Sequence, residues 1–166
     1  MADKAATDKL HVGFLRVISI DAGYVGGLLV TNRIGRPLEF QCTTPVKPNK
    51  TQEVLYGPTL ESYLYSEVLG KTLVDRMAVK PDVLLVEQEE LLPLRETSGI
   101  PIVLLKTVSS SKSGTSVLDS ARCHGSYEED QAVIEKLRKL VPQSADLMEP
   151  LDRVKEALTE ALRTAA

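Results

Sequence analysis

The N-terminal quarter of the chain holds three apolar segments that are separated only by short turns. The segment near 12–20 is almost continuously apolar and β-branched. The segment near 26–32 begins with the pair Gly26-Gly27, which would allow close backbone approach or a tight turn. The segment near 38–44 alternates apolar with polar residues, as a half-exposed strand does. Because connections this short cannot hold a crossover helix, the sequence predicts a three-stranded antiparallel meander.

Beyond this meander the hydrophobic pattern predicts alternating helix and strand. Apolar residues recur at spacings of three and four over 58–77, which predicts a helix that begins near Pro58. Continuous apolar runs at 83–86 and 101–105 predict buried strands, parallel to the first strand and reached by right-handed crossovers. The predicted fold is therefore α/β, with a five-stranded mixed sheet and helices packed against it.

Two helix-start signals organise the C-terminal part. The run Ser126-Tyr127-Glu128-Glu129 has the spacing of a capping box, and Asp146 precedes the last amphipathic helix. We expect a flexible N-terminus over 1–9, one domain over 10–141, and a C-terminal helix over 142–166 that packs on the same domain. The serine-rich segment 107–120 is predicted to be the most mobile internal part.

Composition limits the class of protein. With 166 residues, 43% of them hydrophobic and 26% charged, the chain is typical of one globular domain. The absence of a long apolar run or an apolar leader predicts no membrane association and a cytoplasmic protein. Residues 127–166 hold nine acids and six bases, whereas residues 1–126 hold fourteen of each. This balance argues against tight, non-specific binding of nucleic acid.

Carboxylates follow the first and fourth predicted strands and open a late helix. Asp21 comes after the first strand and Glu87 after the run 83–86, while Glu128, Glu129 and Asp130 stand together further on. If those two strands are parallel neighbours, Asp21 and Glu87 would converge at one edge of the sheet. Hard cations prefer carboxylate oxygens, and two such ions can activate water and stabilise a leaving phosphate oxygen. The sequence thus predicts a Mg²⁺ or Mn²⁺ site.

The same residues resemble motifs of the ribonuclease H-like superfamily, most closely those of its RuvC-type Holliday-junction resolvases. In that branch an Asp closes the first strand within I-D-x-G, here Ile20-Asp21-Ala22-Gly23, and a Glu ends the fourth strand, here in Pro81–Glu87. The resemblance covers roughly residues 12–140 and implies a metal-dependent nuclease or nucleic-acid-processing protein. The implied catalytic residues are Asp21, Glu87, Glu129 and Asp130, and the implied metal ligands are Asp21, Glu87 and Asp130.

Basic residues on the predicted loops would contact the phosphates of a DNA or RNA partner. These candidates are Lys47, Lys50, Lys112 and Arg122, with Lys106 beside them. The family's basic DNA-facing helices are not obvious here, and the turn after Asp21 is shorter than in resolvases. A relative that retains the scaffold without the nuclease would show the same departures.

Each acid also has an ordinary structural explanation. Asp21 suits a turn, Glu87 could solvate a loop, and the acids at 128–130 suit a helix N-terminus. The alternative function is a non-catalytic module that acts through protein–protein contacts or as a homodimer. Seven aromatic residues, none of them Trp, argue against a surface that stacks single-stranded bases. A structural zinc site is not supported, because His11, Cys42, Cys123 and His124 contain no Cys-x2-Cys pair.

Overall fold

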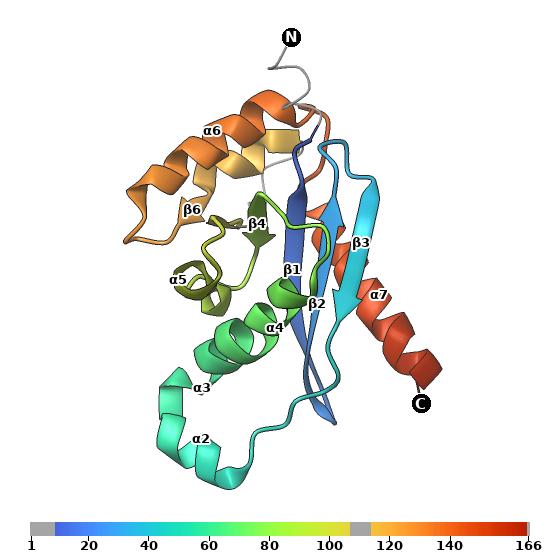
Figure 1. Ribbon diagram of the computed structural model, residues 1–166, viewed down its shortest axis with the longest axis vertical. Coiled ribbons are helices and arrows are strands. Elements are labelled where there is room, and N and C mark those ends of the chain that lie inside the picture. The colour runs from blue at the N-terminus through green and yellow to red at the C-terminus, as the bar shows by residue number, and fades with distance from the viewer. Residues whose placement is uncertain (1–8, 107–113, 166) are drawn as a thin grey trace.

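The computed structural model describes residues 9–106 and 114–165, which form a sheet covered by helices on both faces (Figure 1). Over these residues the sheet has six strands in the order β3-β2-β1-β4-β5-β6. Strand β1 is antiparallel to β2 and parallel to β4, β2 is antiparallel to β3, β4 is parallel to β5, and β6 is antiparallel to β5. The predicted α/β class and mixed sheet are confirmed. The strands are β1 (Val12–Ile20), β2 (Gly23–Thr31), β3 (Pro37–Cys42), β4 (Val83–Val86), β5 (Ile102–Leu104) and β6 (Arg122–Cys123).

The sixth strand corrects the prediction of five. Strand β6 is two residues long and pairs Cys123 with Val103 at the edge of the sheet. It is too short to contain an apolar run from which a strand could be predicted. It follows the 3-10 helix η4 (Gly114–Ser120), in which Val117 and Leu118 are buried. That part of the serine-rich segment is anchored in the core, contrary to the predicted mobility. The remainder of the segment, 107–113, lies outside the described residues.

The helical region after β3 begins earlier than predicted and is not one regular α-helix. Asn49 caps a first helix, α2, and Gly57 ends it, six residues before the π-helix begins at Tyr63. The predicted helix over 58–77 is confirmed as helical over most of its length, but its middle is a π-helix that follows a short 3-10 turn. The elements are α2 (Lys50–Tyr56), η1 (Gly57–Thr59), α3 (Leu60–Ser62), η2 (Tyr63–Gly70) and α4 (Lys71–Arg76).

The two faces of the sheet carry separate cores because side chains alternate along each strand. Val12 and Phe14 of β1 face the core on one side, and Leu15 and Val17 face the core on the other. The first core is closed by η4 and by two helices, α6 (Gln131–Leu140) and α7 (Glu149–Ala165). The second is closed by η2 and α4 together with η3 (Glu89–Leu91) and α5 (Leu94–Ser98).

Two adjacent glycines on β2 allow helices to approach the sheet on both faces. A Cβ at Gly27 would lie 2.9 Å from Leu158 Cδ2 of α7. A Cβ at Gly26, which faces the opposite side, would lie 3.1 Å from Leu73 Cδ1 of α4. The close backbone approach expected from this glycine pair is therefore present, and it sets the depth at which both helix layers pack.

The start of α7 follows the predicted signal, whereas the start of α6 does not. The Asp146 carboxylate accepts the backbone N–H groups of Met148 at 2.9 Å and Glu149 at 3.3 Å. At the other helix the chain passes through a 3-10 turn, η5 (Glu128–Asp130), and no side chain caps α6. Among the described residues, no helix is both long and apolar enough to span a bilayer.

Candidate functional site

The carboxyl ends of β1, β4 and β5 are where the sequence placed a shared acidic site. Strand β4 runs beside only the first part of β1, with Val83 opposite Val12 and Leu85 opposite Phe14. Continuing this register brings Glu87, just past the end of β4, to the level of Arg16. The residue of β1 that neighbours Glu87 is therefore a base and not an acid.

Asp21 lies far from this level. It occupies the exposed two-residue turn between Ile20 and Gly23, at the tip of the β1–β2 hairpin. Five residues separate it from Arg16, which at the rise of an extended strand is roughly 16 Å. The structure thus does not bring Asp21 to Glu87. The prediction assumed that both strands end at one level, whereas β1 and β2 continue as a two-stranded ribbon beyond β4.

Arg16 holds Glu87 and the start of α7 together. Its Nη1 lies 3.0 Å from Oε1 of Glu87 and 3.4 Å from Oδ1 of Asp152. The same nitrogen donates to the backbone carbonyl of Leu151 at 3.3 Å. The contact with Glu87 is one of charge, since its geometry is not that of a directed hydrogen bond. The two side chains are only 19% and 24% exposed, so the pair sits between the sheet and α7.

The next residue, Gln88, extends the β1–β4 pairing with its side chain. Its Oε1 accepts the backbone N–H of Val17, and its Nε2 donates to the carbonyl of Val17, both at 2.9 Å. The amide therefore replaces the strand that ends at Val86 and satisfies both backbone groups of Val17. This clamp fixes the direction in which Glu87 leaves the sheet.

Asp130 is also bound to an arginine. It is 3% exposed, and its Oδ2 accepts a 2.7 Å hydrogen bond from Nε of Arg95 on α5. This hydrogen bond raises the pKa of the Arg95 guanidinium, which also lies 3.8 Å from the ring centre of Tyr127. Glu129 is 69% exposed and reaches Arg95 only at 3.9 Å. Asp130 therefore joins α5 to the start of α6 and does not face Glu87 as a free ligand.

The predicted acids thus occupy three places: a hairpin tip, the Arg16 contact and the Arg95 contact. Within residues 9–106 and 114–165, no group of three or more His, Cys, Asp and Glu side chains is arranged to hold a metal ion. The convergence of carboxylates expected from the sequence is absent from this part of the chain. Metal binding itself stays a prediction.

The predicted phosphate-binding residues also lie at separate places in the structure. Lys47 and Lys50 are exposed after β3 at one edge of the sheet, whereas Arg122 lies on β6 at the other. Arg122 forms an ion pair with Glu89, and Lys50 lies 3.7 Å from Glu53. Lys112 lies outside the described residues, and Lys106 is exposed just after β5. These bases do not gather on one surface of the described chain.

A hollow of about 580 Å³ lies beside β6. Its lining includes Arg122 with its partner Glu89, and His124, whose Nε2 is 3.2 Å from Oε1 of Glu96. Burial raises the pKa of the neighbouring Cys123 thiol to about 11, so this cysteine remains a protonated core residue. The polar side chains here contact one another, as they do around Arg16.

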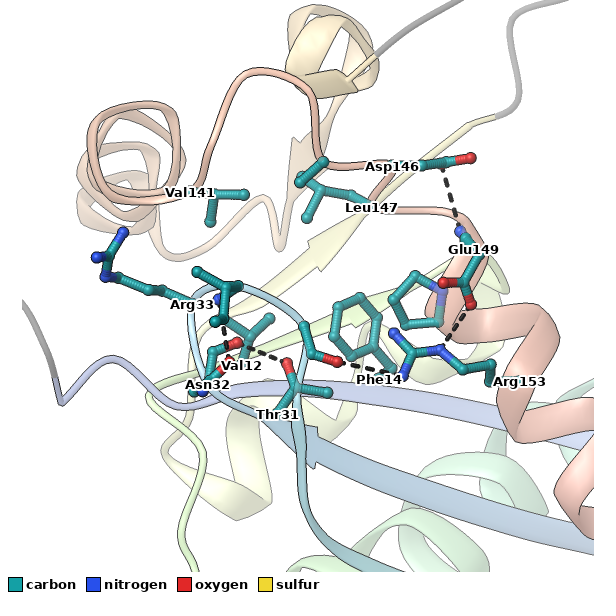
Figure 2. A pocket seen from close by; sticks show the side chains of 14 residues that line it. Val12, Phe14, Thr31, Asn32, Arg33, Val141, Asp146, Leu147, Glu149 and Arg153 are labelled. Carbon is teal, nitrogen blue, oxygen red and sulfur yellow. Dashed lines mark hydrogen bonds and ion pairs between the residues drawn. The ribbon is translucent and has the colours of Figure 1, made fainter.

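A second hollow, of about 210 Å³, lies between the start of β1, the β2–β3 turn and the start of α7 (Figure 2). Arg153 donates there to Glu149 at 2.6 Å and to the carbonyl of Gly35 at 3.1 Å. Arg33 donates to the carbonyl of Leu140 at 3.4 Å. These arginines fasten the turn to α7 and α6, and none of the predicted acids lines this hollow.

Sequence reasoning missed the three residues that organise the strand ends: Arg16, Gln88 and Arg95. One signal was available, because Arg16 is a charge within the most apolar strand of the chain. A base that is retained in a buried strand indicates a buried acid nearby. No comparable signal distinguishes Gln88 or Arg95 from ordinary surface residues.

Comparison with known proteins gives remote structural likeness only. No protein-family model and no curated protein sequence matches the chain. Among solved structures, an endonuclease V from Streptomyces avermitilis is 10% identical and has a TM-score of 0.49, over 93% of this chain and 82% of that one. An endonuclease V from Ciona intestinalis, solved with a 23mer DNA that contains an inosine followed by a ribo-adenosine, is 14% identical with a TM-score of 0.37.

The Ciona alignment covers 59% of this chain, which spans just under half, 46%, of that enzyme. An endonuclease V from Bacillus subtilis is 11% identical, with a TM-score of 0.35, over 61% of this chain and 46% of that one. Structural similarity at this level does not allow the role of any residue in those enzymes to be assigned to a residue of this chain. The RuvC-type branch suggested by the sequence motifs is a finer assignment that these structures do not reach, and it stays a prediction. The chain is thus similar to endonucleases V at 10–14% identity, and no family is assigned to it.

Proposed function

We propose that this chain is a non-catalytic ribonuclease H-like module that acts through contacts with proteins. The observation that carries the proposal is the pairing of Arg16 with Glu87 at the end of β4. A divalent ion bound by carboxylates needs those oxygens to face a common point. Here a guanidinium already supplies the positive charge beside Glu87, and Asp21, the acid that should complete the pair, lies roughly 16 Å further along β1 than Arg16, at the hairpin tip.

The binding of Asp130 to Arg95 supports the same function. A buried carboxylate that accepts a 2.7 Å hydrogen bond from a nearly buried guanidinium would have to break that contact to bind a metal ion. Breaking a buried pair leaves an uncompensated charge, which costs about 3–5 kcal/mol. Both acids that the strands and helices bring near the sheet are therefore used as structural cross-links.

The competing function is the Mg²⁺- or Mn²⁺-dependent nuclease that the sequence motifs imply. Cleavage of labelled single-stranded, duplex and junction DNA and RNA separates the two, with each ion supplied in turn. We expect no metal-dependent product from the unmodified chain, and the same background from Glu87→Gln. Cleavage that requires the ion and is lost in both Glu87→Gln and Asp21→Asn would establish the nuclease and overturn our proposal.

A further inference from the structure

Helix α2 is an arm that buries none of its residues. Its Val54 is 69% exposed and Leu55 is 77% exposed, and none of its seven residues is buried in the chain. We use the name α2 arm for residues 47–56, which project from one end of the molecule (Figure 1). Consecutive aliphatic side chains this exposed are available for contact with another molecule.

The arm is helical because it is capped and not because it is packed. The Asn49 side chain accepts the N–H of Gln52 at 2.8 Å, and Gln52 Oε1 accepts the N–H of Asn49 at 3.0 Å. At the other end the N–H of Gly57, which has φ of 53°, bonds the carbonyl of Glu53. A seven-residue helix with no buried side chain is marginal in water even with both caps. The caps therefore prepare a helical shape in which Tyr56 stacks on Tyr63, with ring centres 4.4 Å apart, while Val54 and Leu55 stay exposed.

A groove between β3 and α7 has the complementary chemistry. It measures about 550 Å³, and its apolar lining comes from Leu29, Phe40, Val154 and Ala157. On the same face of β3 as Phe40, Leu38 is 43% exposed. Glu156 and Glu160 of α7 are exposed at the groove.

The charges of the two surfaces are opposite. Lys47 and Lys50 are exposed at the start of the arm, and Lys50 reaches only Glu53, at 3.7 Å. The groove presents Glu156 and Glu160, of which Glu160 lies 3.8 Å from Arg163. The one base that lines the groove, Arg153, is bound to Glu149 and to the carbonyl of Gly35. An apolar centre with lysines on one side and glutamates on the other is the arrangement of a specific interface.

Arm and groove of one chain lie apart in this structure. The arm leads into α3, η2 and α4, which cover one face of the sheet, whereas α7 covers the opposite face. We propose that the α2 arm of one copy docks in the β3–α7 groove of a second copy, and that the exchange is reciprocal. A seven-residue helix alone covers too little surface for a stable complex, and a two-fold dimer doubles the contact. This inference rests on the proposed function, because it names a second copy as the protein partner.

The test is the molar mass of the full chain, measured by sedimentation velocity over a range of concentrations. We expect a dimer for the unmodified protein. Leu55→Asp and Ala157→Arg should each raise the dimer Kd about 100-fold or more, since each change occurs twice in a symmetric dimer. Glu53→Gln on the arm and Lys155→Gln on α7 are matched controls that should remain dimeric. Circular dichroism melting checks that each variant is folded.

Mixing the two disrupting variants gives the sharper result. The Ala157→Arg chain retains an intact arm, and the Leu55→Asp chain retains an intact groove. Their mixture should form heterodimers more tightly than either variant forms homodimers. A monomeric unmodified protein, variants that stay dimeric, or a mixture that gains nothing would each overturn the inference. Metal-dependent cleavage by a protein that dimerises as described would instead overturn the proposed function and leave the dimer standing.

Discussion

The strand ends and the α2 arm differ in which side chains they bury and which they expose. At the strand ends, charged groups that belong in water are held under the helices, where Arg16 meets Glu87 and Arg95 meets Asp130. On the arm, apolar groups that belong in a core are exposed, with Leu55 at 77%. The charged groups of the first region are paired within the chain, whereas the exposed aliphatic groups of the second are not covered by it.

This difference locates where function should be sought. A carboxylate that is already neutralised by a guanidinium contributes to stability and has little left to offer an incoming cation. Exposed aliphatic side chains on a capped helix contribute nothing to stability until another surface covers them. The acids that the sequence motifs single out are therefore paired within the chain, whereas the exposed apolar side chains lie on the α2 arm, which no motif singled out.

Replacing Asp130 by Asn tests the closed region most severely. The change leaves the Arg95 charge with only the distant, exposed Glu129 beside it. We expect the free energy of unfolding to fall by about 3 kcal/mol, the usual result of breaking a buried pair. Urea denaturation measures it, with Glu129→Gln as the control at less than about 0.5 kcal/mol. Equal, small effects for both variants would show that Asp130 is not a structural cross-link.

The side-chain clamp at the end of β4 gives a smaller effect. Gln88→Ala removes both 2.9 Å hydrogen bonds to Val17 and leaves two backbone groups of β1 unpaired. We expect a loss of about 1–3 kcal/mol in unfolding free energy and faster hydrogen exchange at the Val17 amide. The exposed Gln143, replaced by Ala, serves as the control. Unchanged exchange at Val17 would contradict the clamp.

Removing the cap of α2 should destabilise the arm without lowering the global stability of the chain. Asn49→Ala removes the reciprocal cap of α2. We expect hydrogen exchange in α2 to quicken by the equivalent of about 1 kcal/mol. Global unfolding measured on the monomer should change by less than about 0.5 kcal/mol, since α2 buries no side chain in its own chain. A global loss as large as the local one would mean that the arm belongs to the core.

A substitution at the hairpin tip should have almost no effect on stability. Asp21→Asn changes an exposed turn residue, so the melting temperature should move by an amount equivalent to less than about 0.5 kcal/mol, with or without Mn²⁺. A clear stabilisation together with loss of a Mn²⁺-induced rise would instead indicate repelling carboxylates at a metal site. A loss of about 0.5–2 kcal/mol would show that the carboxylate stabilises the turn.

The fold was predictable from the sequence where periodicity carries it. The strand runs of β1, β2 and β4, the glycine pair on β2 and the Asp146 cap all follow from local pattern. Strand β6 and the extension of β1 beyond β4 were not predictable, because pairing register depends on contacts between distant segments. The expected convergence of Asp21 and Glu87 is not seen for the same reason: these acids follow neighbouring strands, but those strands end at different levels.

We propose above all that Glu87 and Asp130, which are engaged by arginines, do not share a metal ion. Titration of ¹⁵N-labelled protein with substoichiometric Mn²⁺ tests it directly, because the paramagnetic ion broadens amide signals close to its site. The account predicts that broadening at residues 87 and 130 does not exceed the broadening at an exposed acid such as Glu160. Strong, saturable broadening at both residues, relieved by EDTA and absent in Glu87→Gln, would contradict it.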